Sequence, residues 1–187
     1  ITIPNSVTSI GRYAFSGCTA LTSLKIPDGV TTIAGYTFDG CTNLTSISIP
    51  NSLTSIVKNA FKDCTSLKKI YYSGTPSEWT QINIELSGNY NYVIREASIH
   101  YARCGKNVDW SFDKKNGTLT ISGTGAIEDI DEKDCTPWHD ERSNIQAIVI
   151  KSGVTDIGSN VFCGYTNLIN ITIPSTVKRL GGYAFGE

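Results

Sequence analysis

Histidine and methionine are scarce in this sequence. Of its 187 residues, only two are histidines, His100 and His139, and none is methionine. The two histidines lie far apart along the chain, so we expect neither histidine-dependent catalysis nor a zinc site. No segment offers the roughly 20 consecutive apolar residues that a transmembrane helix requires. The chain is therefore not expected to insert into a membrane.

The sequence has no excess of either charge, with 16 Lys plus Arg against 17 Asp plus Glu. A protein that binds nucleic acid needs a surplus of basic residues to neutralise phosphates, so this class of partner is not expected. Apolar residues make up 40% of the chain and aromatic residues 10%, which is enough to form a packed core. The composition thus predicts a folded protein that does not bind nucleic acid.

Catalytic motifs are also missing. The sequence contains no G-x-S-x-G, no phosphate-binding P-loop and no H-E-x-x-H. Cys135 and His139 are close in sequence, but they lack both a second pair of metal ligands and an acid to orient the histidine. We interpret Trp138 as a buried plug and His139 as a surface residue. No enzymatic activity, metal or cofactor is expected.

What the sequence does contain is an internal repeat of 23 residues. Four kinds of residue recur at this spacing, namely Pro4, Pro27 and Pro50; Phe15, Phe38 and Phe61; Cys18, Cys41 and Cys64; and Leu21, Leu44 and Leu67. The pattern returns near the C-terminus, where Ile148 matches Ile171 and Phe162 matches Phe185. Self-similarity at a fixed period of this length is typical of a repeat solenoid. Because the chain starts at Ile1 inside a repeat, we expect it to be a fragment of a longer protein.

Each repeat predicts one coil of the solenoid. In Ser23–Ile26 the side chains alternate, so Leu24 and Ile26 should point inward while Ser23 and Lys25 point outward. Residues 30–33 predict a second short strand, and residues 35–41 one helical or 3₁₀ turn with Phe38 directed inward. Stacked about 4.8 Å apart, equivalent strands would form a parallel sheet. One coil cannot bury its own apolar face, whereas a stack of coils can.

Two segments break the period and predict caps over the ends of repeat arrays. In the first, Thr75 or Ser77 should begin a short helix that carries Trp79 and Ile82 inward, and residues 98–101 should form a final strand. In the second, residues 110–113 and 118–121 flank Asn116-Gly117, which predicts a β-hairpin. Trp79 and Trp110 are expected to be buried against the adjoining coils.

These caps predict two domains. Residues 1–101 would be the C-terminal part of a leucine-rich repeat array with its end cap. Residues 104–187 would be the cap hairpin and the first repeats of a second array. The predicted fold class is a leucine-rich-repeat solenoid with short parallel β-strands, helical or 3₁₀ turns, and hairpin and short-helix caps.

Individual repeats, such as Leu44–Pro50 followed by Asn59–Phe61 and Cys64, resemble the BspA-type leucine-rich repeat. The segments around Trp79 and Gly117–Gly125 resemble the terminal units of large bacterial surface proteins of this kind. The resemblance implies an extracellular protein, on the cell surface or secreted, whose repeats present a face for adhesion to host matrix proteins or other cells. One departure is that Tyr165 stands where the repeat has cysteine, with Cys163 two positions earlier.

The repeated cysteines share one position beside the core phenylalanines. We expect Cys18, Cys41 and Cys64 to form a structural ladder of buried, reduced thiols next to Phe15, Phe38 and Phe61. Disulfides between coils are the alternative. Cys104 and Cys135 lie outside the repeats, and a bridge between them is left open.

The predicted binding face is formed by outward residues of the main sheet. Thr2, Lys25, Ser48 and Tyr71 share one repeat position, and Ser23, Ser46 and Lys69 share another. Such rows suit an extracellular protein ligand.

Other roles remain open at this point. The repeats could instead be a stalk or spacer that presents other domains. A glycan could stack on exposed aromatic residues, for which the candidates are Tyr71, Trp79, Tyr90 and Tyr92. The acidic segment 128–141 is either a Ca²⁺ site or a solvated loop.

Overall fold

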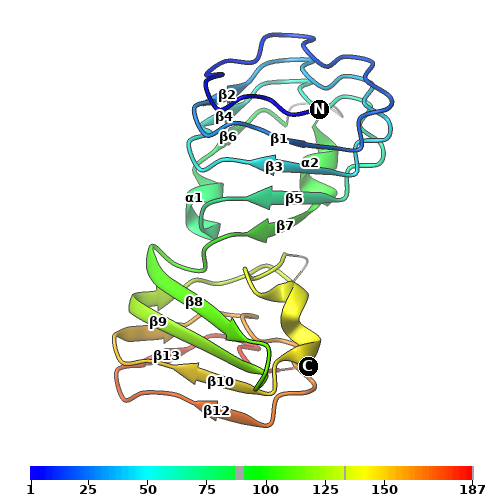
Figure 1. Ribbon diagram of the computed structural model, residues 1–187. Coiled ribbons are helices and arrows are strands. Elements are labelled where there is room, and N and C mark those ends of the chain that lie inside the picture. Colours follow the sequence, from blue (N-terminus) through cyan, green and yellow to red (C-terminus); the bar gives the residue numbers. More distant parts are fainter. Residues whose placement is uncertain (87–90, 133, 187) are drawn as a thin grey trace. The chain divides into compact units, whose positions relative to one another are not determined.

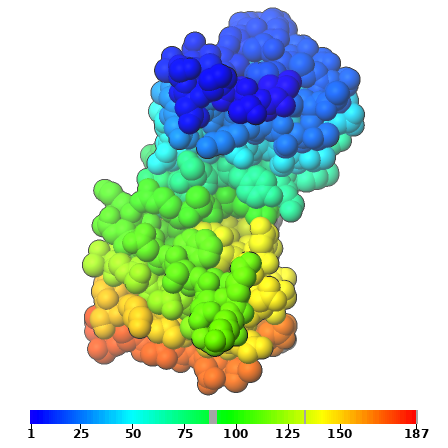
Figure 2. Space-filling view, in the orientation of Figure 1, coloured from blue at the N-terminus to red at the C-terminus, as the bar shows by residue number. Residues whose placement is uncertain are grey.

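The structure is a computed structural model that describes residues 1–86, 91–132 and 134–186. The chain forms two compact units, Ile1–His100 and Tyr101–Glu187 (Figure 1). Each unit is built of stacked coils, and the short strands of successive coils pair into sheets. Figure 2 shows the surfaces of the units coloured by sequence. None of the helices in these described residues is long and apolar enough to cross a membrane.

Two narrow sheets run through the coils of the first unit. One has the strand order β1 (Ser23–Lys25), β3 (Ser46–Ile49), β5 (Lys69–Tyr72) and β7 (Ser98–Tyr101). The other contains β2 (Thr32–Ile33), β4 (Ser55–Ile56) and β6 (Asn83–Ile84). Ser23 pairs in parallel with Ser46, and Ser46 with Lys69, so the register follows the repeat.

Side-chain alternation produces the core as predicted. Leu24, Ile47 and Ile70 are buried and lie side by side on adjacent strands, because the register pairs Leu24 with Ile47 and Ile47 with Ile70. The residues on either side of each point outward, because successive side chains of a strand lie on opposite faces. The parallel-strand solenoid predicted from the repeat is therefore confirmed.

The turn predicted for residues 35–41 is a series of hydrogen-bonded turns. The N–H groups of Thr37, Asp39 and Cys41 donate to the carbonyls of Ala34, Tyr36 and Phe38. Tyr36 and Gly40 have φ angles of 62° and 71°, and such left-handed residues prevent a continuous helix. This geometry directs alternate N–H groups to the next coil.

A stack of phenylalanine rings occupies the centre of the first unit. The ring centroids of Phe15 and Phe38 are 5.4 Å apart, and those of Phe38 and Phe61 are 5.1 Å apart. The rings are nearly parallel, with interplanar angles of 8° and 17°. Aromatic pairs of this kind contribute about 0.5–1.5 kcal/mol beyond the area that they bury.

A short helix closes the stack after β5. Helix α1 (Pro76–Thr80) begins with a capping box, in which Thr75 Oγ1 accepts from the Glu78 amide and Glu78 Oε2 accepts from the Thr75 amide. Trp79 is only 9% exposed and packs edge-on against Tyr72, with centroids 5.1 Å apart. Ile82 is buried as well. The predicted burial of Trp79 is confirmed, with Thr75 rather than Ser77 as the N-cap.

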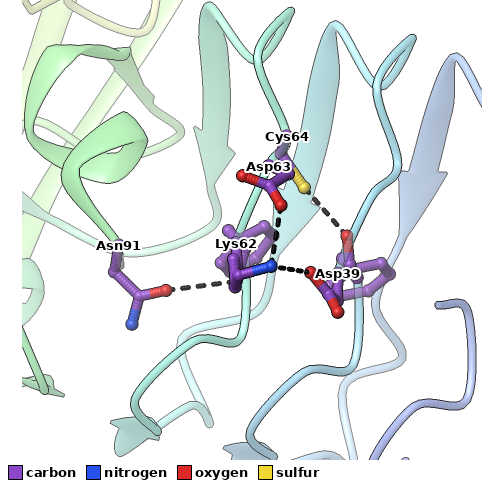
Figure 3. Close-up of polar contacts among 7 residues, drawn as sticks. Asp39, Lys62, Asp63, Cys64 and Asn91 are labelled. Atoms are coloured by element: carbon purple, nitrogen blue, oxygen red, sulfur yellow. Dashed lines mark hydrogen bonds and ion pairs between the residues drawn. The ribbon is translucent and has the colours of Figure 1, made fainter. Parts of the chain in front are cut away.

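Asn91 completes the cap with its side chain. In the preceding coils, the amides of Phe15 and Phe38 donate to carbonyls of the following coil. For Phe61 this acceptor is Asn91 Oδ1, at 3.1 Å (Figure 3). Asn91 Nδ2 in turn donates to the carbonyls of Val57 and Glu85, at 3.1 Å each. The fully buried side-chain amide of Asn91, just before helix α2 (Tyr92–Glu96), thus takes the place of a main-chain carbonyl in the last coil of the first unit.

The second unit begins with the predicted hairpin. Strand β8 (Asn107–Asp113) pairs antiparallel with β9 (Thr118–Ile127), and both extend beyond the predicted residues. Strand β9 then pairs in parallel with β10 (Ala147–Ile150) and with β11 (Val154–Ile157). The sheet ends in β12 (Asn170–Thr172) and β13 (Arg179–Leu180), and a 3₁₀ helix spans His139–Asn144.

The tryptophan that caps the second unit is Trp138 and not Trp110. Trp138 is 1% exposed and heads a stack with Phe162 and Phe185, with centroid separations of 5.7 and 5.2 Å. Trp110 is 36% exposed and only touches Trp138 edge-on, at 5.9 Å. Its predicted burial was wrong because β8 pairs with β9 alone and so lies at the margin of the core. The interpretation of Trp138 as a plug is confirmed.

Replacing Trp79 with alanine should destabilise the first unit from its cap inward. Truncation of a buried tryptophan costs about 3–5 kcal/mol, and repeat stacks depend on contacts between neighbouring coils. In hydrogen-exchange mass spectrometry, we expect exchange to rise first in residues 44–72 while residues 148–186 stay protected. Equal loosening of both segments would show instead that the two units unfold together.

Replacing Asn91 with alanine should leave the buried Phe61 amide without its acceptor. An unsatisfied buried polar group costs about 1–3 kcal/mol, which urea unfolding can measure. Asn43 is the matched control, because its Nδ2 also bridges two coils, donating to the Thr19 carbonyl at 2.8 Å, but at an exposed site. A loss for Asn91→Ala no larger than for Asn43→Ala would contradict the role given to Asn91.

Candidate binding face

Six of the seven residues predicted for the binding face lie together on the first sheet. Strand register places Lys25, Ser48 and Tyr71 in one row. The other row contains Ser23, Ser46 and Lys69. The lysines and Ser23 are exposed, the other serines are half-buried, and Tyr71 is 39% exposed. We call these six residues the sheet face.

Thr2 does not belong to the sheet face, in contrast to the prediction. Residues 1–3 form no strand, and β1 is the first strand of the sheet. The repeat motif is present there in sequence, but residues 1–3 do not pair with a strand of the sheet. Thr2 is exposed and takes no part in the rows.

His100 extends the row of Tyr71, and sequence reasoning missed it. Their ring centroids are 5.0 Å apart with an interplanar angle of 40°. His100 lies 29 residues after Tyr71 and not 23, so the repeat does not predict the pair. Alternation within the expected strand was the available signal, since Ile99 and Tyr101 are buried and His100 therefore points outward.

The aromatic residues proposed for glycan stacking are not gathered into one platform. Trp79 is buried in the cap, so its candidacy was wrong. Tyr92 is 47% exposed on α2, and no ring contact joins it to Tyr71 within the described part of the chain. Tyr90 lies outside the described residues.

The cysteine ladder of the first unit consists of free thiols bonded to the neighbouring coil. Cys41 Sγ donates to the Phe15 carbonyl at 3.0 Å. Cys64 Sγ donates to the Phe38 carbonyl, also at 3.0 Å (Figure 3). Burial raises the pKa of Cys64 to about 12 and also raises the pKa of Cys41, so both thiols stay protonated and able to donate. Cys18 is only half-buried, contrary to expectation.

The remaining cysteines follow a different arrangement in the second unit. Cys104 and Cys135 are both free and buried, so no bridge joins them, and burial raises the pKa of Cys104 to about 12. Tyr165, at the repeat cysteine position, packs perpendicular to Phe162 with centroids 5.7 Å apart. Its hydroxyl lies 3.3 Å from Thr136 Oγ1. A phenol thus replaces the thiol as the polar group at this position.

Described carboxylates of the acidic segment 128–141 bind other parts of the second unit. Asp129 Oδ1 accepts from the Ser159 amide at 2.6 Å, and this bond lowers the pKa of Asp129. Asp134 accepts from the Tyr101 hydroxyl at 3.0 Å, and Glu141 pairs with Lys114 at 2.6 Å. Among the residues that the structure describes, no three His, Cys, Asp or Glu side chains are grouped to hold a metal ion.

Solved structures similar to this chain include several bacterial leucine-rich repeat proteins. One from Eubacterium ventriosum is 33% identical over 44% of this chain, with a TM-score of 0.40, and the match spans 22% of its own length. A leucine-rich repeat protein from T. pallidum is 19% identical over 97% of this chain and 72% of its own, with a TM-score of 0.37. A leucine-rich cell surface protein from Faecalibacterium prausnitzii is 19% identical over 88% of this chain and 39% of its own, with a TM-score of 0.28. No curated protein matches the chain.

The family model that matches is the BspA type leucine rich repeat region. Six copies of it cover residues 1–100 and 139–187, which is most of the chain and includes the coils of both units. The part it omits contains the hairpin of β8 and β9. The chain therefore belongs to the BspA-type leucine-rich repeat family.

Proposed function

We propose that this chain is a non-enzymatic binding module of a cell-surface or secreted protein, and that its sheet face mediates adhesion to a host matrix protein or another cell. Family membership supports this role, and one similar structure is that of a cell surface protein. Within this proposal, residues 1–101 are the end of one array with its cap, and residues 104–187 begin a second array.

The observation that carries the proposal is the composition of the sheet face. Strands β1, β3, β5 and β7 contain Lys25, Lys69, Tyr71 and His100 but no aspartate or glutamate. Tyrosine is enriched among the residues that dominate binding energy. The lysines would attract an acidic partner surface and orient it during encounter. The expected ligand is therefore a protein with an acidic patch that accommodates an exposed tyrosine.

The rigidity of the sheet face also favours binding. Main-chain hydrogen bonds join each of its strands to the next, for example from Ile26 N to the Ser48 carbonyl at 2.9 Å. Ser48, the neighbour of Tyr71 on strand β3, has a small side chain, and the ring of His100 packs against Tyr71 from strand β7 at 5.0 Å. This chain would therefore lose little conformational freedom when a partner binds, and a small loss improves affinity.

Replacing Lys25, Lys69 and Tyr71 together with alanine should weaken binding without unfolding the protein. Loss of a central interface tyrosine can cost about 2 kcal/mol or more, whereas exposed side chains contribute little to stability. We expect surface plasmon resonance against immobilised collagen, laminin and fibronectin to show at least one ligand that the variant binds roughly 30-fold less tightly. The thermal midpoint should be nearly unchanged.

A matched control carries the same three substitutions elsewhere. Lys115, Lys178 and Tyr183 are exposed residues of the second unit and lie outside the sheet face. Their joint replacement with alanine should leave binding unaltered. Equal binding by both variants, or no binding of the unmodified chain to any of these proteins, would contradict adhesion through the sheet face and favour a spacer.

A further inference from the structure

A cavity of about 480 Å³ in the second unit is lined by the acidic segment 128–141 and by the turn after β11. The segment contributes Asp131, Glu132 and Asp134, and the 3₁₀ helix that begins within it contributes His139 and Arg142. The described lining thus includes three carboxylic acids and one guanidinium. We call it the acidic cavity.

Two carboxylates of the acidic cavity are not held by the fold. Asp131 and Glu132 are exposed, and within the part of the chain that the structure describes neither side chain has a hydrogen-bond or ion-pair partner. Asp134, by contrast, already accepts from the Tyr101 hydroxyl. Over residues 128–141 the sequence has seven Asp and Glu against a single lysine. The segment therefore carries a net negative charge that a cationic partner surface can complement.

The sheet face of the first unit has the opposite charge. Lys25 and Lys69 are exposed, and strands β1, β3, β5 and β7 contain no aspartate or glutamate. Lys25 lies two strands from Tyr71 in the same row, about 10 Å away, and Lys69 precedes Tyr71 by two residues on β5, about 7 Å away. The two lysines therefore lie on different sides of an aromatic ring that is 39% exposed.

The acidic cavity is large enough to receive a tyrosine side chain. Pockets that bind small molecules have volumes of roughly 300–1,000 Å³, and about 480 Å³ lies within that range. Arg142 does not oppose such a ring, because a guanidinium stacks favourably on aromatic faces. Asp131 and Glu132 are adjacent in sequence, so they offer two neighbouring negative charges to lysines beside the ring.

Tyr71 does not occupy the acidic cavity of its own chain. Its ring packs against His100, and the described residues that line the cavity all belong to the second unit. Each copy of the chain therefore presents two surfaces of opposite charge, one on each unit. The sheet face calls for an acidic partner that accommodates a tyrosine, and the second unit of another copy meets both conditions.

We propose that the sheet face of one copy binds the acidic cavity of a second copy, with Tyr71 at the mouth of the cavity and the two lysines beside Asp131 and Glu132. This inference rests on the proposed function, because it uses the same face, and it names the partner. The two surfaces differ, so the contact joins copies head to tail. A contact of this size is weak by itself, and many copies on apposed cells would add avidity.

Sedimentation velocity of the whole chain tests the proposal. Between about 5 and 500 µM, we expect the weight-average sedimentation coefficient to rise with concentration, as a weak self-association requires. The rise should be smaller at about 500 mM than at about 50 mM salt, because salt screens the charges that join the copies. A coefficient that stays constant over the whole range would overturn the proposal.

Two charge-reversal variants identify the surfaces. The sheet variant carries Lys25→Glu and Lys69→Glu, and the cavity variant carries Asp131→Lys and Glu132→Lys. Each variant alone should self-associate at least ten-fold more weakly, with a thermal midpoint nearly unchanged because these side chains are exposed. An equimolar mixture should associate again, since the acidic cavity of the sheet variant meets the sheet face of the cavity variant. A mixture that stays monomeric would contradict the pairing of these two surfaces.

Asp109→Lys combined with Asp140→Lys is the matched control. Both residues are exposed in the second unit, do not line the acidic cavity and produce the same change in net charge. This variant should self-associate like the unmodified chain. An equal loss in the control and the cavity variant would show that net charge alone governs association, and would overturn the assignment to the cavity.

The matrix-protein measurements separate this inference from the proposed function. Self-association without binding to collagen, laminin or fibronectin would support a second copy as the partner of the sheet face. Binding to one of these proteins without self-association would overturn this inference alone and leave adhesion through the sheet face in place.

Discussion

Each coil of this chain depends on the next coil for hydrogen bonds that it cannot form within itself. The amides of Phe15 and Phe38 point along the stack to carbonyls of the following coil, and the thiols of Cys41 and Cys64 point back to carbonyls of the preceding one. A buried amide or thiol without a partner destabilises the fold, so the coils must remain in register. The phenylalanine stack and the rows of outward side chains follow the same register.

The same register aligns equivalent side chains of successive coils on two different surfaces. Strand residues repeat their direction from coil to coil, and the sheet face results. Turn residues repeat as well, so Tyr13 lies over Tyr36. Because neither set contributes to the core, each can differ between coils at little cost to stability. The outward rows of the strands and the residues of the turns can therefore change in sequence independently of each other.

The repeat predicted most of the first unit, because each side chain that recurs every 23 residues has the same neighbours in every coil. The pairing of Ser23 with Ser46, the inward Phe38 and the capping role of Trp79 all follow from periodicity and composition. The rest depends on places where the period fails. His100 joins the row of Tyr71 across an irregular connection, and Trp138 rather than Trp110 covers the second unit.

Asn91 could not be foreseen for a related reason. Its partners are main-chain atoms of residues 57, 61 and 85, and a sequence does not show which main-chain groups lack a neighbour until the end of the stack is known.

Asn91 also bears on how proteins of this kind change in length. Its amide contacts main-chain atoms that every coil presents in the same geometry, rather than a side chain peculiar to the coil before it. Such a closure would fit behind any coil of the same shape. Duplication or deletion of whole 23-residue units would therefore lengthen or shorten the array without a compensating change at its end. The number of coils can thus evolve independently of the Asn91 cap.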